Sequence, residues 1–408
     1  MAVGKPTFGV MHPVRGFRLG TTRARIKHPE RRDLVVMEAA AGSTIAGTFT
    51  RNAFCAAPVT VCQHNLSQVR TDRPLLLVIN TGYANAGTGA RGMTDARAVC
   101  EALAQQAGVD VSQVFPFSTG VIGEPLPVAR VVDGLPGCLA ALRETGWDDA
   151  AHGIMTTDTR PKGASVQLAL AGGTVTISGI SKGAGMIQPN MATMLGYVAT
   201  DAAVAPALLQ RLARQATDQS FNVITVDGDT STNDSCMLVA TGQSGVHIEE
   251  SNQEDLAAFT AALDEVYLQL AQAIIRDGEG ATKFVAVEVS AARSPAEARA
   301  VAFTIANSPL VKTALFASDP NWGRILAAVG RAPIENLDVN GVSVALNGVL
   351  IAERGGLAES YTEAAGSAEM QKEEIHIQVT LGRGEAVATV WTTDFSYDYV
   401  KINADYRT

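Results

Sequence analysis

The sequence has few of the features that mark secreted, membrane or zinc-binding proteins. No apolar stretch reaches the roughly 18 uncharged residues that cross a bilayer, and residues 1–17 lack the charged-then-apolar order of a secretory signal. The cysteines are odd in number and form no C-x-x-C pair, so they predict neither a disulfide framework nor a zinc site: Cys55, Cys62, Cys100, Cys138 and Cys236. We therefore expect a cytoplasmic protein with buried thiols and no metal.

Positive charge is also scarce. Lys and Arg number 32 against 41 Asp and Glu, which gives a net charge of −9, and no dense basic run could follow a phosphate backbone. Nucleic acid and membrane are therefore not expected as partners. The chain is instead rich in hydrophobic residues, which make up 47% of it, so it can bury a large interior. A length of 408 residues exceeds what one core usually serves, and two or three subdomains are expected.

Hydrophobic periodicity predicts a mixed α/β chain. Helical spacing indicates helices at 93–107, 128–142 (interrupted at Pro136), 206–218, 254–276 and 296–308. Short apolar or alternating runs indicate strands at 34–38, 46–50, 59–62, 75–79, 166–170, 174–180, 283–289, 342–350, 375–381 and 386–392. Gly172-Gly173 predicts a hairpin, and the runs 342–350 and 375–381 are expected to pair with 386–392. Strands and helices in both halves favour a layered α/β architecture.

The most informative segment delivers a lone threonine, Thr193, from a loop rich in glycine and proline onto a predicted buried strand. A threonine hydroxyl inside a chain has no neighbouring group to take its proton. Cleavage of the Ala192-Thr193 bond would give Thr193 an α-amine with a pKa of about 7.7 to 8.0, able to act as base for its own hydroxyl. Gly183, Gly185 and Pro189 suit a strained bond, although on spacing alone a surface loop leading into a core strand explains the segment better.

Three other motifs suggest different chemistry. The run 179–183 fits the G-x-S-x-G elbow of α/β hydrolases, but Gly183, Gly185 and Pro189 prevent the helix that must follow. The run 87–92 fits G-x-G-x-x-G, yet it starts seven residues beyond Asn80, the end of its strand candidate. The run 227–234 has calcium-loop character, but Leu238 stands where a bidentate glutamate is required, so we interpret it as a hydrogen-bonded turn.

The loop around Thr193 closely resembles the self-processing site of the ornithine acetyltransferase family, the glutamate N-acetyltransferases of the cyclic arginine pathway. Further matches to this family follow in order over nearly the whole chain: Asn80–Gly87, Pro116–Val121, Met155–Thr159, Val226–Asp234, Asp277–Lys283 and Ile402–Thr408. The resemblance implies an α/β/β/α sandwich like that of N-terminal-nucleophile proteins, spanning about 1–280, with a smaller mixed α/β part over about 281–408. It also implies self-cleavage into an alpha chain (1–192) and a beta chain (193–408) that stay associated.

The resemblance also implies roles for particular residues. Thr193 would be the nucleophile, and Thr119 and Gly120 the oxyanion hole, although the sequence alone favours a simple turn at that pair. The amino-acid pocket would comprise Thr156, Lys182, Thr193, Glu279, Asn403 and Thr408, so the C-terminal tail is expected to be tied down. Without the resemblance, Lys182 would be a solvated loop lysine, Glu279 an exposed turn acid, and Thr156 a cap.

The implied reaction moves an acetyl group from N-acetylornithine to glutamate by a ping-pong route through an acetyl enzyme, with no cofactor. Some family members also use acetyl-CoA, a point on which this sequence is silent. The implied assembly is a heterotetramer of two alpha and two beta chains. The alternative function is that of a related self-processing amidase or aminopeptidase, which would pass the acyl group to water.

Overall fold

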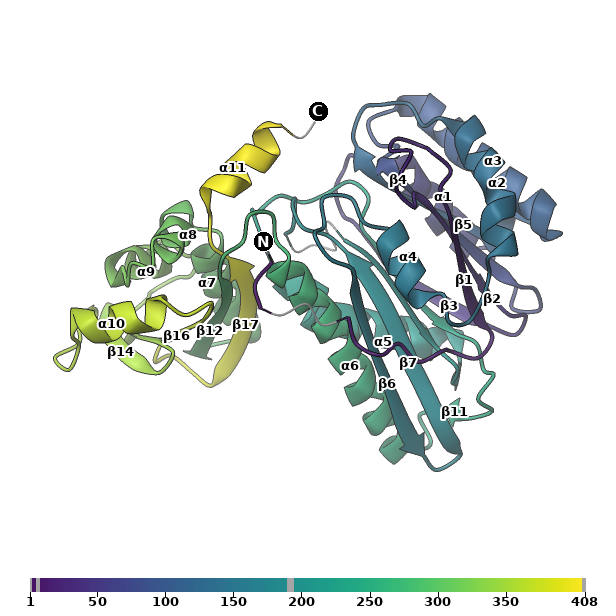
Figure 1. Ribbon diagram of the computed structural model, residues 1–408. Helices are drawn as coiled ribbons and strands as arrows, with labels where there is room; N and C mark the ends of the chain where they lie inside the picture. Colours follow the sequence, from purple (N-terminus) through teal and green to yellow (C-terminus); the bar gives the residue numbers. More distant parts are fainter. Residues whose placement is uncertain (1, 5–7, 189–193, 406–408) are drawn as a thin grey trace. The chain divides into compact units, whose positions relative to one another are not determined.

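The computed structural model describes residues 2–4, 8–188 and 194–405, and its chain divides into two compact units. We call Thr7–Asn222 with Thr230–Ile274 the sandwich unit, and Met1–Pro6, Val223–Asp229 and Ile275–Thr408 the C-terminal unit (Figure 1). The predicted cut between Ala192 and Thr193 lies outside the described residues, so the division into alpha and beta chains stays a prediction, as does a subdomain boundary near 280.

The first sheet of the sandwich unit has the strand order β1-β2-β4-β5. Its strands are β1 (Phe17–Thr22), β2 (Leu34–Ala39), β4 (Leu75–Tyr83) and β5 (Val114–Val121). The first three pair antiparallel, whereas β4 and β5 run parallel and are joined by a helical crossover, α2 (Gly89–Ala107). Because β5 is an edge strand beside β4, its last residues lie next to the last residues of β4.

The second sheet has the strand order β3-β10-β8-β7-β6. Its strands are β3 (Thr44–Phe49), β6 (Lys162–Leu170), β7 (Gly173–Lys182), β8 (Leu195–Thr200) and β10 (Ser235–Ala240). The hairpin predicted around Gly172-Gly173 is confirmed as β6 and β7, with Leu170 opposite Gly173. A two-stranded ribbon of β9 (Ala203–Val204) and β11 (His247–Ile248) lies outside this sheet.

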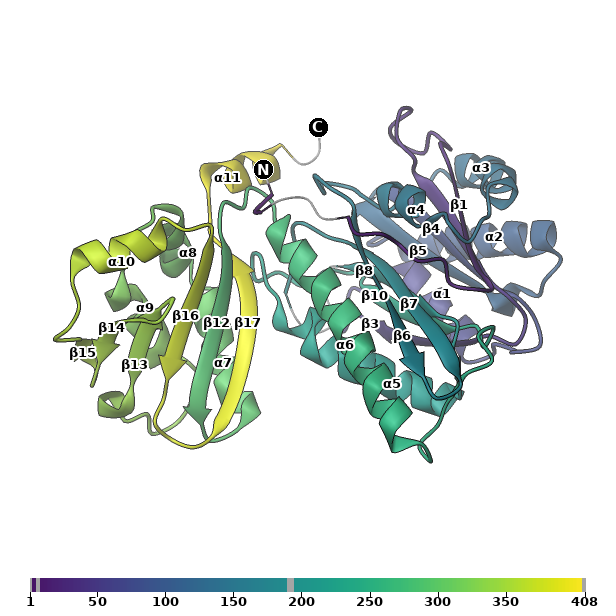
Figure 2. The ribbon, with the colours of Figure 1, turned by 60° about the horizontal axis from the view of Figure 1, so that its bottom comes forward.

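The two sheets pack face to face, and helices cover the outer faces (Figure 2). One buried cluster joins Phe17, Ile79 and Phe117 of the first sheet to Tyr197 and Met237 of the second. On the other side of the first sheet, its side chains pack with α1 (Ala57–Leu66), α2 and α3 (Val128–Ala140). The second sheet is covered by α5 (Pro206–Gln219) and α6 (Gln253–Arg276), while the short α4 (Trp147–Gly153) contacts β1 and β7. The predicted α/β/β/α sandwich is confirmed.

The C-terminal unit is built on a six-stranded sheet of order β15-β14-β13-β16-β12-β17. Its strands are β12 (Phe284–Ala292), β13 (Ser343–Leu346), β14 (Val349–Glu353), β15 (Gly356–Leu357), β16 (Glu374–Thr380) and β17 (Ala386–Thr393). Val285, Val287 and Val289 form a buried face of β12 that packs with α7 (Pro295–Ala306), α8 (Pro309–Phe316) and α9 (Trp322–Gly330). The remaining helices are α10 (Glu363–Met370) and α11 (Tyr397–Ala404).

Three expectations about local structure are wrong. The run 59–62 is part of helix α1, which begins beside Pro58 and buries Val59, Val61 and Cys62. The run 342–350 is a hairpin, since Asn347 and Gly348 both adopt positive φ and turn β13 into β14. Helix α3 continues through Pro136 instead of breaking there.

The predicted pairing in the C-terminal sheet is also wrong. β16 lies between β13 and β12, while β17 pairs with β12 and, through a single bridge at Trp391, with Ile224. Because β16 and β12 run parallel, the segment between them must cross over the sheet, which the sequence pattern did not indicate.

Candidate active site

The predicted nucleophile Thr193 and its neighbour Ala192 lie outside the described residues, but the chain on both sides of them is placed. β7 ends at Lys182, and the first residue of β8, Leu195, pairs with it. On the other side Leu195 pairs with Ser235, whose backbone N–H donates to the Met194 carbonyl at 3.1 Å. The start of β8 is therefore held between the end of β7 and the start of β10.

Thr119 and Gly120 lie near the end of β5, half-buried. Gly120 has φ 136°, and a Cβ there would lie 2.2 Å from the carbonyl carbon of Gly82 on β4. Only glycine fits, because another side chain would strain the backbone and clash with the neighbouring strand. The ammonium of Lys182, a buried residue, donates to the Thr119 hydroxyl at 3.3 Å. The structure thus brings together Lys182 and the predicted oxyanion pair.

Asp158 joins two of the predicted substrate-binding residues, and sequence reasoning assigned it no role. One carboxylate oxygen accepts the Thr156 N–H at 3.0 Å, and the other accepts the Gly183 N–H, directly after Lys182, at 2.8 Å. The second oxygen also accepts the Lys162 ammonium at 2.6 Å. Although burial by itself raises the pKa of Asp158, the charges of Lys162 and Lys182 outweigh it and hold the pKa below its usual range. The carboxylate therefore stays ionised.

Asp234 is a second buried carboxyl near the start of β8 that sequence reasoning did not single out. Burial raises its pKa well above the usual range, against the lowering influence of the Met194 backbone and the Lys182 charge. Its Oδ2 has no hydrogen-bond partner among the described residues. The only sequence feature that could have drawn attention to Asp234 is its place at the end of the motif 226–234, directly before β10. That motif does not indicate that the carboxyl is buried.

Thr156 connects the hydrogen-bond network around Asp158 to the loop before β2. Its N–H bonds to Asp158, and its carbonyl accepts from the Arg31 guanidinium at 2.9 Å. The main chain of Thr156 is thus fixed from two sides while its side chain stays half-exposed. That arrangement suits a hydroxyl that must meet a ligand.

Glu279 and Asn403 lie in the C-terminal unit and contact each other there. The Asn403 amide donates to Glu279 Oε2 at 2.9 Å, and Glu279 is buried. Helix α11 is held at its start as well, because the Ser396 hydroxyl caps it and donates to the Gly280 carbonyl at 2.6 Å. Thr408 lies outside the described residues. Glu279 and Asn403 form one group, and Thr119, Gly120, Thr156 and Lys182 form another in the sandwich unit.

The motifs that suggested other chemistry do not form the expected sites. Ser181 of the hydrolase-like elbow lies inside β7, buried, and donates to the Leu270 carbonyl of α6 at 3.3 Å. β4 ends at Tyr83 and α2 begins at Gly89, so the glycines at 87–92 do not turn directly from strand into helix. Across residues 2–4, 8–188 and 194–405, no group of three or more His, Cys, Asp or Glu could hold a metal ion.

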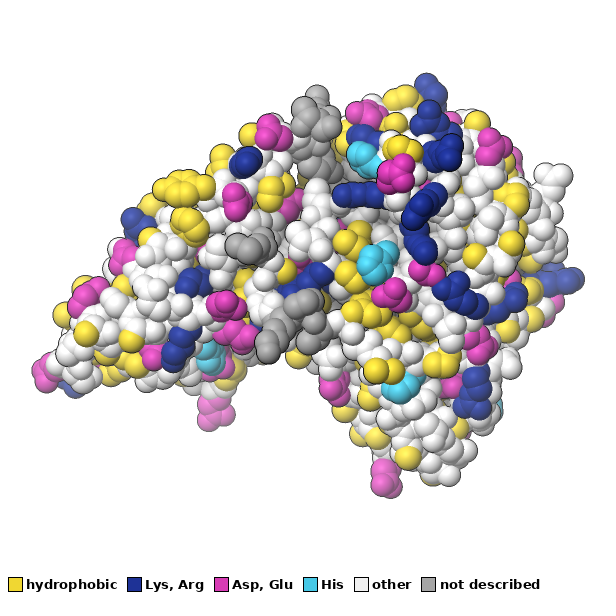
Figure 3. Space-filling model, viewed as in Figure 1, with side chains coloured by type: hydrophobic (Ala, Val, Ile, Leu, Met, Phe, Trp, Pro, Cys, Tyr) yellow, Lys and Arg dark blue, Asp and Glu magenta, His cyan; other side chains and the backbone are white. Residues whose placement is uncertain are grey.

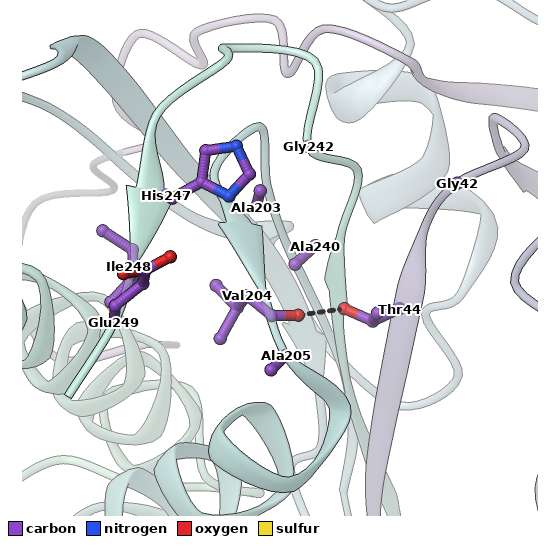
Figure 4. Close-up of a pocket in the computed structure, with 10 residues that line it drawn as sticks. All are labelled: Gly42, Thr44, Ala203, Val204, Ala205, Ala240, Gly242, His247, Ile248 and Glu249. Atoms are coloured by element: carbon purple, nitrogen blue, oxygen red, sulfur yellow. Dashed lines mark hydrogen bonds between the residues drawn. The ribbon is translucent and has the colours of Figure 1, made fainter. Parts of the chain in front are cut away.

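A cavity of about 280 Å³ lies at the opposite end of the second sheet from Lys182 (Figure 4). The small side chains Ala203, Ala205 and Ala240 line much of it, and the Thr44 hydroxyl donates to the Val204 carbonyl at 2.9 Å in its wall. Because β8 and β10 run parallel, this cavity is a strand's length from the network around Lys182. It is not the predicted active site.

Comparison with known proteins gives matches over the whole chain. The model of the ArgJ family matches residues 18–408. An arginine biosynthesis bifunctional protein ArgJ from Pseudomonas fluorescens (strain Pf0-1) is 56% identical over 409 residues, covering 100% of both chains. A protein of the same name from Methylococcus capsulatus is 55% identical over 396 residues, covering 97% of this chain and 96% of the relative.

Two solved structures with related sequences also match. The arginine biosynthesis bifunctional protein ArgJ of Bacillus halodurans is 37% identical, with a TM-score of 0.49, covering 51% of this chain and 97% of its own. The ornithine acetyltransferase of Mycobacterium tuberculosis, solved with ornithine, is 35% identical, with a TM-score of 0.38, covering 44% of this chain and 93% of its own.

No helix within the described ranges is long and apolar enough to cross a membrane.

Proposed function

Because the chain belongs to the ArgJ family, we infer that it transfers the acetyl group of N2-acetyl-L-ornithine to L-glutamate through an acetyl-Thr193 intermediate. The protein is an acyltransferase of arginine biosynthesis, as is its full-length relative at 56% identity. This full-length identity carries the proposal. The contact of Lys182 with Thr119 beside the start of β8 supports the site that we assign to the reaction.

The proposed reaction begins with self-cleavage. The Thr193 hydroxyl attacks the Ala192 carbonyl, and the C–N bond between Ala192 and Thr193 breaks, which frees the α-amine of Thr193. Water then hydrolyses the resulting ester and frees the Thr193 hydroxyl and the Ala192 carboxylate. In the mature enzyme this amine takes the hydroxyl proton as Thr193 attacks the acetyl carbonyl of N-acetylornithine. Ornithine leaves with the proton, and the amine of glutamate then attacks the acetyl ester, which returns the proton to the Thr193 oxygen.

Thr119 and Gly120 stabilise the negative charge that develops on the acetyl oxygen. The hydroxyl of Thr119 and the backbone N–H of Gly120 are the two donors. Lys182, within 3.3 Å of that hydroxyl, adds a positive charge beside it and attracts the substrate carboxylate. We also assign Thr156, in the same unit, to substrate binding.

In the C-terminal unit, we assign Glu279 to the substrate ammonium, because its carboxylate is buried and accepts a hydrogen bond from the neutral amide of Asn403. We also assign Asn403 and Thr408 to substrate binding. We assign acetyl-CoA as a second acetyl donor, in keeping with the word bifunctional in the names of the relatives. The two fragments remain together as a heterotetramer of two of each, in the cytoplasm, and no cofactor takes part.

The test is product analysis with N-acetylornithine in the presence and absence of glutamate. We expect N-acetylglutamate to form only with glutamate, and free acetate to stay a minor product. Acetate release at a rate that glutamate does not change would identify a hydrolase and contradict the transferase. Thr119→Val removes one oxyanion donor and should lower kcat about 10²- to 10³-fold. Thr94→Val, at an exposed position on α2, serves as the matched control.

A further inference from the structure

A cation-rich loop stands out on an otherwise acidic protein. Half of the residues at 23–32 are cationic, while the whole chain carries a net charge of −9: Arg23, Arg25, Lys27, Arg31 and Arg32. Figure 3 shows Lys and Arg side chains gathered at the upper right, over the part of the sandwich unit that carries the first sheet and α3. The loop is too short to follow a nucleic-acid backbone, but a local surplus of positive charge attracts small anions.

The loop is held in a fixed shape by the protein interior. The buried Asp33 carboxylate accepts the Ala24 N–H at 2.7 Å and the Ile26 N–H at 2.5 Å. From the other side, the Arg130 guanidinium of α3 donates to the carbonyls of Arg25 and Ile26, each at 3.1 Å. Arg25 between them has φ 56°, a left-handed conformation that is costly for a residue with a side chain.

A cavity of about 430 Å³ opens beside this loop, a size suited to a small ligand. Its lining is charged rather than apolar: Ala24, Arg25, Lys27, Pro29, Arg130 and Asp133. Two arginines and one lysine therefore line the same space, with a single acidic residue, Asp133, among them. A second carboxylate, that of Glu124, lies 3.8 Å from the Lys27 ammonium. Guanidinium groups match the geometry of phosphate oxygens.

The cavity lies one strand away from the predicted oxyanion pair. A Cβ on Gly82 would lie 2.7 Å from the Lys27 Cβ, so the Lys27 side chain packs directly against Gly82. Gly82 pairs directly with Gly120 across β4 and β5, and neighbouring strands are about 4.8 Å apart. The Lys27 ammonium also lies over the ring of Tyr83, at 5.6 Å from its centroid. A ligand anchored at Lys27 is thus within reach of Gly120.

We propose that the cavity lined by Arg25, Lys27 and Arg130 binds the phosphate groups of a phosphorylated ligand, and that this ligand is the phosphate-bearing half of acetyl-CoA. The second part rests on the proposed function. In this proposal the thioester of the bound molecule donates its acetyl group to Thr193. The Thr193 oxygen bonds to the acetyl carbon, the carbon–sulfur bond breaks, and the hydroxyl proton passes through the α-amine to the leaving thiolate. No oxidant or reductant is needed.

The first experiment measures the binding of coenzyme A and of pyrophosphate by titration calorimetry. The test variants are Lys27→Met, which keeps the aliphatic stem, and Arg25→Gly, which tolerates the positive φ. Each should weaken binding of both probes about tenfold, because each removes one charge-assisted contact. Glu124→Gln should act in the opposite direction and tighten binding, since it removes the carboxylate nearest to Lys27. Arg214→Gln, an exposed cation on α5, is the matched control and should bind like wild type.

The second experiment compares the two acetyl donors. In Lys27→Met, the ratio of kcat/KM for acetyl-CoA to that for N-acetylornithine should fall about tenfold. In wild type, added salt should raise KM for acetyl-CoA more than KM for N-acetylornithine, because salt screens exposed charges. This second readout needs no variant and holds even if a substitution impairs folding.

The outcomes separate the two parts of the proposal. Pyrophosphate binding that depends on Arg25 and Lys27, without competition from coenzyme A, would assign the cavity to a free phosphorylated metabolite and overturn the acetyl-CoA part. Equal binding of both probes by wild type and the two variants, or no binding at all, would overturn the whole proposal. Absence of any acetyl transfer from N-acetylornithine would refute the proposed function instead, while leaving the binding result intact.

Discussion

Each of the two units buries a lysine, but the groups that surround the ammonium differ between them. In the sandwich unit, Lys162 faces the Asp158 carboxylate at 2.6 Å, and both side chains are 1% exposed or less. In the C-terminal unit, the fully buried Lys312 donates to neutral oxygens, the Thr392 hydroxyl at 2.8 Å and the Thr393 carbonyl, and lies over the ring of Phe395. In the first arrangement the lysine faces a carboxylate, whose pKa is held below its usual range, whereas in the second, burial lowers the pKa of Lys312 to about 7.

The difference reflects what each buried charge does besides packing. Asp158 also accepts the backbone N–H groups of Thr156 and Gly183, so its charge orders two segments that we assign to substrate binding. Lys312 instead joins α8 to the end of β17, just before the turn into α11. A charge that must hold main-chain donors has to stay ionised, and a nearby opposite charge ensures this. A lysine that only links oxygens can tolerate neutralisation near pH 7.

Asp158→Asn is expected to give the largest effect. It removes the carboxylate that faces the buried Lys162, and breaking such a pair costs about 3–5 kcal/mol of unfolding free energy. It also weakens the hold on Thr156 and Gly183, so KM for N-acetylornithine should rise. Urea unfolding and steady-state kinetics measure the two effects. Unfolding free energy and KM that both match wild type would show that Asp158 neither stabilises nor orders the site.

The double variant Asp158→Leu with Lys162→Met sharpens the comparison. Replacing both charges by apolar side chains should restore most of the lost stability, because the desolvation cost disappears along with the attraction. Activity should not return, since Thr156 and Gly183 still lack an acceptor. Recovery of stability and activity together would mean that the ion pair matters only for packing.

Lys312→Met should change how stability depends on pH. The pKa of Lys312 is lowered in the folded state, so between about pH 7 and 10.5 the unfolded chain binds more protons and stability rises with pH. The variant should lose this component, which amounts to about 1.4 kcal/mol per pH unit. Unfolding free energies at pH 7, 8.5 and 10 measure the slope. Lys401→Met, an exposed lysine of α11, is the control and should keep the wild-type slope.

Asn403→Ala should give the smallest effect. It removes the partly buried hydrogen bond to Glu279 in the C-terminal unit, and such a bond contributes about 0.5–1.5 kcal/mol. Stability should change little, while KM for N-acetylornithine should rise because Glu279 loses the neighbour that orients it. A KM equal to that of wild type would show that Asn403 does not contribute to substrate binding.

The sequence indicated most elements with strong periodicity or clear turn signals. The hairpin at Gly172-Gly173 and the long helix α6 lie where they were predicted, because glycine pairs and apolar stripes are local signals. The short run at 59–62 was ambiguous, since an apolar run of that length suits a buried helix as well as a strand. The Asn347-Gly348 pair is itself a hairpin signal, so this turn is predictable from the sequence. Strand order in the C-terminal sheet depends on pairing between strands distant in sequence, and no local sequence pattern indicates it.

The candidate site was predictable only in part. The family resemblance, not the residue pattern alone, pointed to Lys182 and the pair Thr119-Gly120, which the structure brings together. Asp158 and Asp234 lay inside quoted motifs, but their roles depend on burial and on partners distant in sequence. The cations of the loop at 23–32 were visible as residues. Their grouping around one cavity follows from the buried Asp33 and from Arg130 on α3, which only the fold brings together.

The most direct test of the central claim is the intact mass of the purified, active protein under denaturing conditions, with N-terminal sequencing of each fragment. We expect two chains, 1–192 and 193–408, the second beginning with Thr193, and a single 42.6 kDa chain for Thr193→Ala. An active wild-type enzyme that remains one uncut polypeptide, or a Thr193→Ala variant that still splits at this bond, would contradict the account.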